Sequence, residues 1–128
     1  MGGAVFQLCS QLTNAIIGSG VTSIPANAFS SDSALTTVVM GPDVTIIGIQ
    51  AFNGCGLVSV NIPDSVVLID ISAFNNNHNL TKVTVGSNVA SIGISAFASC
   101  GSMTGIYFKG DAPSLGSSAF SGDTATVY

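Results

Sequence analysis

The sequence carries very little charge. It has no glutamate, arginine or tryptophan, and its charged residues are six aspartates and two lysines among 128 residues. Ordinary globular domains carry about 25% charged residues, so the surface of this chain has to be built from serine, threonine, asparagine and glycine. Nucleic-acid binding needs clustered basic side chains that displace counterions from phosphates, and two lysines cannot supply them. We therefore exclude nucleic acid as a partner.

Groups suited to catalysis are scarce as well. His78 is the single histidine, and it lies in the polar stretch Asn75–Asn79, which we interpret as a solvated loop. No sequence pattern places a serine or Asp70 beside this histidine, so a catalytic triad cannot be argued. We expect no enzyme activity and no cofactor.

Long apolar runs are also missing. Although 47% of the residues are hydrophobic, no stretch reaches about 18 consecutive apolar residues, so we expect no membrane span. The N-terminal residues Met1 to Ala4 contain no basic segment, and no secretory signal is visible. We interpret the chain either as a protein that stays inside the cell or as a piece of a longer secreted chain.

The sequence does contain a tandem repeat. Six phenylalanines are spaced 23, 23, 22, 23 and 23 residues apart: Phe6, Phe29, Phe52, Phe74, Phe97 and Phe120. A period of about 20 to 50 residues indicates a solenoid, in which each unit buries its apolar face against its neighbours. We expect residues 1–128 to form a single solenoid domain of about five and a half repeats without evident caps.

Each repeat has the same internal order. The segment after the phenylalanine has the form L-x-x-V-x-V, whose alternating apolar positions predict a short strand with one buried face. A corner rich in Gly, Pro, Asp and Asn follows, and then a second short strand of the form V-x-x-I. We predict that an Ala-Phe pair closes the unit in a single helical turn. The fold class is thus an α/β repeat solenoid, right-handed, with one parallel sheet along each of the two strand segments.

The 22-residue repeat lacks one residue between Phe52 and Leu57. This position falls in the predicted helical turn and its loop, where repeats tolerate changes of length. We expect the register of both sheets to be unaffected.

The three cysteines, Cys9, Cys55 and Cys100, lie three residues after the phenylalanines of the first, third and fifth repeats. Coils stack at about 4.8 Å, so these cysteines are about 10 Å apart, whereas a disulfide needs Cα atoms within about 7 Å. We expect unpaired core residues that bind no metal.

Three aspartates, Asp43, Asp64 and Asp111, recur at the corners and could line up as carboxylate ligands for calcium. Aspartate is also a common turn former, and that role alone accounts for them. We predict no metal site.

The unit A-F-x-x-C-x-x-L-x-x-V-x-I-P-x-x-V-x-x-I, seen in full from Ala51 to Ile69, resembles the BspA-like leucine-rich repeat. The resemblance covers essentially all of residues 4–128. Members of that family are mostly secreted or surface proteins of bacteria and some protists, associated with adhesion to proteins or to other cells. The resemblance therefore implies a secreted or cell-surface location and protein partners.

A candidate protein-binding face is formed by the outward positions of the first strands. Four of the five coils carry threonine just after the first apolar residue, which makes a threonine ladder. β-Propensity alone explains such a row, and ice-binding surfaces also favour it, although Val58 interrupts the ladder here. The candidate face consists of Thr13, Thr36, Thr37, Ser59, Asn61, Thr81, Lys82, Thr84, Thr104 and Tyr107.

A second candidate surface is the isoleucine stripe, Ile49, Ile71 and Ile94, which stands where the family usually has a polar residue. If these side chains are exposed, they form an apolar stripe of the kind that marks interaction sites. If the helical turn covers them, they belong to the core. The sequence leaves both alternatives open.

Two functions compete on this evidence. The first is a non-catalytic module for protein interaction and adhesion, whose partner is a host, cell-surface or self protein. The alternative is a self-assembling structural protein that stacks end to end into oligomers or fibres, because solenoid ends expose unpaired strand edges. An ice-binding threonine surface is a minor third hypothesis.

Overall fold

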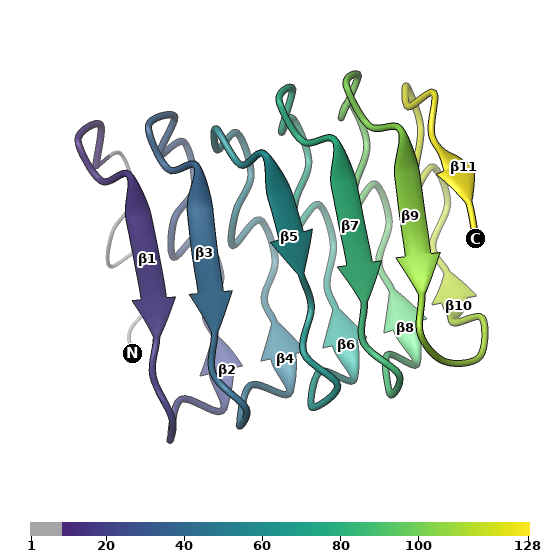
Figure 1. Cartoon of the computed structure of the whole chain (residues 1–128), viewed down its shortest axis with the longest axis horizontal. Coiled ribbons are helices and arrows are strands. Elements are labelled where there is room, and N and C mark those ends of the chain that lie inside the picture. Colours follow the sequence, from purple (N-terminus) through teal and green to yellow (C-terminus); the bar gives the residue numbers. More distant parts are fainter. Residues whose placement is uncertain (1–8) are drawn as a thin grey trace.

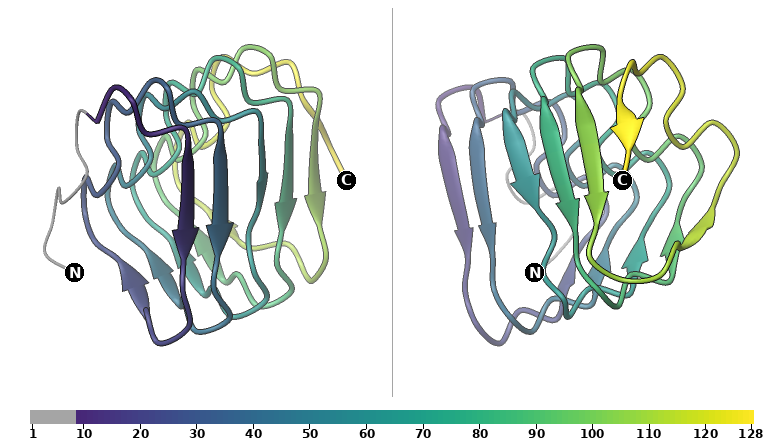
Figure 2. Two further views of the ribbon diagram at one scale, coloured as in Figure 1. Left: turned by 60° about the vertical axis from the view of Figure 1, so that its left-hand side comes forward. Right: turned by 45° about the vertical axis from the view of Figure 1, so that its right-hand side comes forward.

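The computed structural model describes residues 9–128 as a stack of about five coils (Figure 1). Each complete coil contributes a longer strand and a two-residue strand, and all pairings between strands are parallel. Figure 2 shows the longer strands and the last two-residue strand on one side of the stack, and the other two-residue strands on the opposite side. The strands are β1 (Asn14–Ile17), β2 (Ser23–Ile24), β3 (Thr37–Met40), β4 (Ile46–Ile47), β5 (Ser59–Asn61), β6 (Leu68–Ile69), β7 (Lys82–Val85), β8 (Ser91–Ile92), β9 (Gly105–Phe108), β10 (Ser114–Leu115) and β11 (Thr126–Val127).

The two-residue strands form the continuous sheet that the repeat predicts, with the order β10-β8-β6-β4-β2. The longer strands form two sheets instead of one, β1-β3 and β11-β9-β7-β5. The break falls before β5, after the missing residue of the 22-residue repeat. Here the Val58 amide lies 3.3 Å from the Thr36 carbonyl oxygen, whereas the corresponding bond from Thr81 to Val58 is 2.8 Å. The bond still joins equivalent positions of the repeat, so the register is kept, and only the pairing of the longer strands is interrupted where the shortened loop leads into β5.

The predicted helical turn at the Ala-Phe pair is wrong, and no helix occurs in residues 9–128. The amide of Ala28 donates to Pro25 three residues back, but the amide of Phe29 donates to Ala51 of the next coil. A helix needs successive amides to bond within the same segment. Asn27, with φ of 59°, also lies outside the helical region. The equivalent residues with positive φ are Gln50, Ser72, Ser95 and Ser118.

The repeated phenylalanines form one stacked column in the core, as their spacing predicts. The rings from Phe29 to Phe97 are buried, with centroids 5.1 to 5.2 Å apart in successive coils and planes within 7° of parallel. Phe120 continues the column at 5.7 Å and is half-buried. Phe6 lies outside the described residues.

Aliphatic side chains from both strand segments fill the rest of the interior. Leu57, Ile69 and Leu80 are fully buried in the central coils. Backbone packs directly on backbone at the corners, because a Cβ atom on Gly86 would lie 2.3 Å from the carbonyl oxygen of Pro63. The close stacking of coils thus depends on glycine at that corner as well as on the apolar core.

The three cysteines are unpaired, as the register predicts. Cys55 and Cys100 are buried core residues, and Cys9 is half-buried. Their position in the repeat also carries polar residues, which are considered below.

Replacing Phe52 with alanine should lower the free energy of unfolding by about 3 to 5 kcal/mol, because it opens a cavity in the middle of the ring column. Phe120→Ala is the matched control, and it should cost less because that ring is half-buried and its column ends there in the described chain. Denaturant unfolding measures both. A loss of less than about 1 kcal/mol for Phe52→Ala would show that the column does not hold the core together.

Candidate interaction surfaces

The threonine ladder lies on the outward side of the longer strands, and its hydroxyls are already used within the solenoid. Three of the four hydroxyls donate to a backbone carbonyl of the preceding coil: Thr36 to Thr13 at 3.3 Å, Thr81 to Val58 at 3.0 Å and Thr104 to Thr81 at 3.0 Å. The fourth, that of Thr13, accepts a hydrogen bond from Asn14 Nδ2. The ladder therefore ties coil to coil. What it offers a partner is methyl groups and the remaining oxygen lone pairs.

The structure brings all ten residues of the candidate protein-binding face onto one side of the stack. Thr81 and Thr84 are half-buried there and the other eight are exposed. The face changes character along the stack. Exposed Ile16 and Val39 pair at the β1-β3 end, polar side chains follow in the middle, and Tyr107 lies at the β9 end. The face also crosses the break between β3 and β5.

An aromatic cluster stands at the β9 end of this face. The ring of Tyr107 stacks on that of Tyr128, with centroids 4.8 Å apart and planes 3° from parallel. Lys82 Nζ lies 5.0 Å from the centre of the Tyr107 ring, within the range of a cation–π contact. Gly105 leaves room for that ring, because a Cβ atom there would lie 2.9 Å from it. The sequence analysis missed Tyr128, although it follows a V-x-V-like segment in the same phase as Tyr107.

The isoleucine stripe is exposed, which decides between the two alternatives. Ile49, Ile71 and Ile94 expose 42, 41 and 47% of their surface. The turns of the Ala-Phe segment do not fold over them, since alternate amides of that segment point to the next coil. In and next to the strands of the second sheet, Ile46 and Val67 are likewise exposed, at 40 and 46%.

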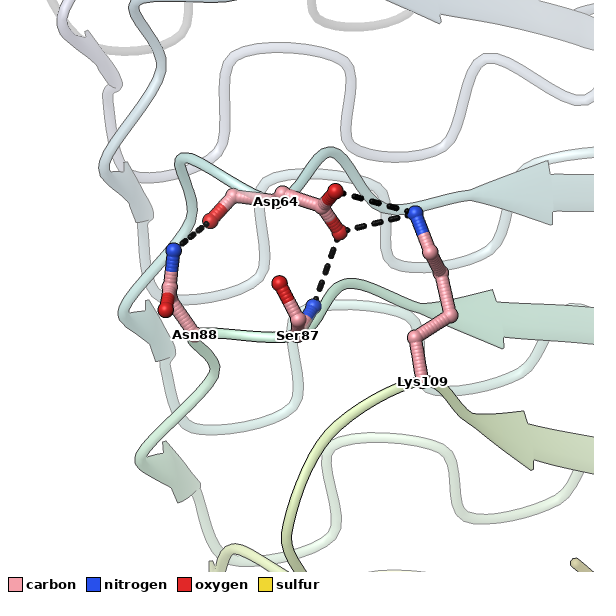
Figure 3. Close-up of polar contacts among 4 residues, drawn as sticks. All are labelled: Asp64, Ser87, Asn88 and Lys109. Carbon is pink, nitrogen blue, oxygen red and sulfur yellow. Dashed lines mark hydrogen bonds and ion pairs between the residues drawn. The ribbon is translucent and has the colours of Figure 1, made fainter.

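The aspartates at the corners bind backbone amides and a lysine. Figure 3 shows Asp64, whose Oδ1 accepts a hydrogen bond from the Ser87 amide at 2.8 Å and lies 2.9 Å from Lys109 Nζ. Asn88 donates to the backbone carbonyl of Asp64, and Asp43 accepts an amide of the preceding corner. The hydrogen bond from Lys109 holds the pKa of the Asp64 carboxyl below its ordinary value. The ion pair is exposed, so its contribution to stability is small.

No cluster of metal-ligating side chains occurs among the described residues. His78 is exposed in its loop. A pocket of about 360 Å³ at the last coil is lined mainly by apolar side chains such as Phe108, Phe120 and Val127. Tyr128 is the one residue in this lining with a titratable side chain. The part of the chain that the structure describes has no helix long and apolar enough to cross a membrane.

Residues 1–126 match the model of the BspA type leucine rich repeat region in six copies. No curated protein matches the chain. Among solved structures, a leucine rich cell surface protein from Faecalibacterium prausnitzii is 24% identical with a TM-score of 0.64, over 88% of this chain and 39% of that one. The pneumococcal vaccine antigen PcpA is 21% identical with a TM-score of 0.77, over 96% of this chain and 34% of that one.

The chain therefore spans less than two fifths of the length of these two proteins. At these identities the likeness establishes a shared fold and no more. The family model, in contrast, covers nearly the whole chain. The chain belongs to the BspA-type leucine-rich repeat family.

Proposed function

We propose that the chain is a non-catalytic protein-binding module of a secreted or cell-surface protein that acts in adhesion. The family is one of repeat solenoids that are generally non-catalytic. The two similar solved structures are described as a cell surface protein and as a vaccine antigen. Both descriptions support a location outside the cell for a chain with this fold.

The aromatic cluster of Lys82, Tyr107 and Tyr128 is the observation that carries this proposal. Tyrosine is enriched among the residues that dominate binding energy, since it offers a large contact area with few torsions to fix. Here the two rings are pre-organised by stacking and flanked by one cation, on a face that is otherwise uncharged. A partner that docks on this face therefore has few charges to desolvate.

Ice binding is less well supported than protein binding. A flat, unbroken row of free hydroxyls would favour it, but three of the four ladder hydroxyls donate to backbone carbonyls and Val58 interrupts the row. The break in the sheet before β5 lies under the same row.

Replacing Tyr107 with alanine should weaken binding to a protein ligand at least tenfold, because it removes both the stacked ring and the cation–π contact of Lys82. The measurement is surface plasmon resonance of the purified chain over a panel of immobilised extracellular-matrix proteins. Ile94→Ser, on the opposite side of the stack, is the matched control and should leave the affinity unchanged. Equal affinities for Tyr107→Ala and the wild-type chain, with a loss for Ile94→Ser, would move the binding site to the other face.

The exposed stripe supports self-association as a second candidate function. Ile71 stands between Ile49 and Ile94 in successive coils, so a twofold axis near Ile71 would bring the stripe of one copy against that of a second copy. The flanking side chains of the second sheet are mostly uncharged, so repulsion between two copies is confined to Asp70. Asp70 is close in sequence, but its Oδ1 accepts the amide of Ile71. End-to-end stacking stays a prediction.

Replacing Ile71 with lysine should shift the chain toward the monomer, since a charge at the centre of an apolar contact has to be desolvated. Light scattering coupled to size-exclusion chromatography at about 100 μM measures the mass. Ile16→Lys adds the same charge to the opposite face and should leave the association state unchanged. A wild-type chain that is monomeric at this concentration would rule out self-association through the stripe.

A further inference from the structure

A column of small polar and thiol side chains runs through the stack beside the phenylalanines. Its members stand three residues after each of the six repeated phenylalanines. In successive coils they alternate between cysteine and an aspartate or asparagine. Asp32 and Asn77 are fully buried although they are polar. The members are Cys9, Asp32, Cys55, Asn77, Cys100 and Asp123.

In three successive coils the column supplies a hydrogen-bond donor to the phenylalanine of the preceding coil. The acceptor is the backbone carbonyl oxygen of that phenylalanine, which in Phe29 also accepts the Asp32 amide and in Phe74 also accepts Asn77 Nδ2. The bonds run from Cys55 Sγ to Phe29 at 3.1 Å, from Asn77 Nδ2 to Phe52 at 2.8 Å and from Cys100 Sγ to Phe74 at 3.3 Å. In these three coils the position thus carries a hydrogen-bond donor.

The two aspartates of the column are unlike the other members, because an ionised carboxylate only accepts hydrogen bonds. One oxygen of each is satisfied: Asp32 Oδ1 accepts the amide of Cys9, and Asp123 Oδ1 accepts the amide of Cys100 at 2.9 Å. The second oxygen, Oδ2, is buried in both residues and has no hydrogen-bond partner. A buried charged oxygen without a partner is costly, whereas a protonated one becomes a donor.

We propose that Asp32 and Asp123 take up a proton in the folded chain under mildly acidic conditions and then donate through Oδ2, as Asn77 donates through its amide. The repeat register places the Phe97 carbonyl before Asp123 as it places the Phe74 carbonyl before Cys100. Protonation of Asp123 thus adds a hydrogen bond between its coil and the coil of Phe97, and protonation of Asp32 removes the charge from its buried Oδ2.

The groups that face these carboxyls support this assignment. Burial raises the pKa of Asp123 to about 6, although the hydrogen bond from the Cys100 amide lowers it by a smaller amount. Burial also raises the pKa of Asp32, and there the hydrogen bond from the Cys9 amide has the smaller, lowering effect. The titratable neighbours in the column are thiols, and burial raises the pKa values of Cys55 and Cys100 to about 12, so they stay neutral. Lys82 and Lys109, the two lysines of the chain, lie on the outward face and at a corner.

The direction of the pH dependence follows from these shifts. A carboxyl with a raised pKa in the folded state stabilises the fold below its ordinary pKa, near 4, and this contribution is lost as the pH rises through the folded value. Stability should therefore fall between about pH 4 and about pH 6 and then level off. If the aromatic cluster is the binding site proposed above, Tyr128 in the coil of Asp123 should be held more firmly in acid.

The test is denaturant unfolding of the full chain between pH 4.5 and pH 7.5. For the wild-type chain the unfolding equilibrium constant should rise about 10-fold to 100-fold over this range. The double variant Asp32→Asn with Asp123→Asn should lose most of this dependence, because an amide donates at every pH. Asp111→Asn, at an exposed corner, is the matched control and should keep the wild-type dependence. Unfolding that is independent of pH, or more favourable in acid, would overturn the proposal.

A second variant and a direct titration cover the case in which the double variant does not fold. Asn77→Asp puts a third acid into the column and should steepen the pH dependence of the unfolding constant. Carbon-13 NMR of the aspartate carboxyls should show Asp123 titrating near pH 6. Titration of both Asp32 and Asp123 at or below pH 4 would show that they are charged and would refute the donor role, whether or not the binding proposal holds.

Discussion

Stacking of one coil on the next at a fixed register is the constraint on which the rest of this structure depends. A single coil of about 23 residues has two short strands and a set of turns, and it can bury its apolar side chains only against a neighbour. The phenylalanine column makes this explicit, since each ring from Phe29 to Phe97 is covered by the rings of adjacent coils at 5.1 to 5.2 Å. Everything that ties coils together therefore stabilises the core as well.

Polar side chains form many of the hydrogen bonds between coils. In a chain with only eight charged residues, uncharged side chains thus pair with many backbone amides and carbonyls. Thr81 and Thr104 donate to carbonyls of the coil before them, Asp64 accepts an amide of the next coil, and Asn77 donates to Phe52. Each of these side chains is used inside the molecule. A row of polar residues on a repeat protein is therefore weak evidence for a binding site until its hydrogen bonds are known.

The two sides of the stack offer different chemistry to a partner. The longer strands present an uncharged polar face with one aromatic and cationic cluster, and the two-residue strands present the isoleucine stripe. On neither side do three or more potential metal ligands gather within residues 9–128. A partner of the proposed binding face would meet little electrostatic steering, because the face carries one charged side chain, Lys82.

The sequence by itself determined the period, the solenoid, the phenylalanine column and the unpaired cysteines, because these follow from the spacing of side chains along one chain. Tertiary structure alone decided the rest. Positive φ at Asn27 and the bond from Phe29 to Ala51 replaced the expected helical turn with turns that bond across coils. The break before β5, the exposure of the stripe, the pairing of Tyr107 with Tyr128 and the orphaned Oδ2 atoms of Asp32 and Asp123 likewise depend on contacts between residues about one repeat apart. Such contacts exist only once the coils have stacked, so local sequence preferences cannot specify them.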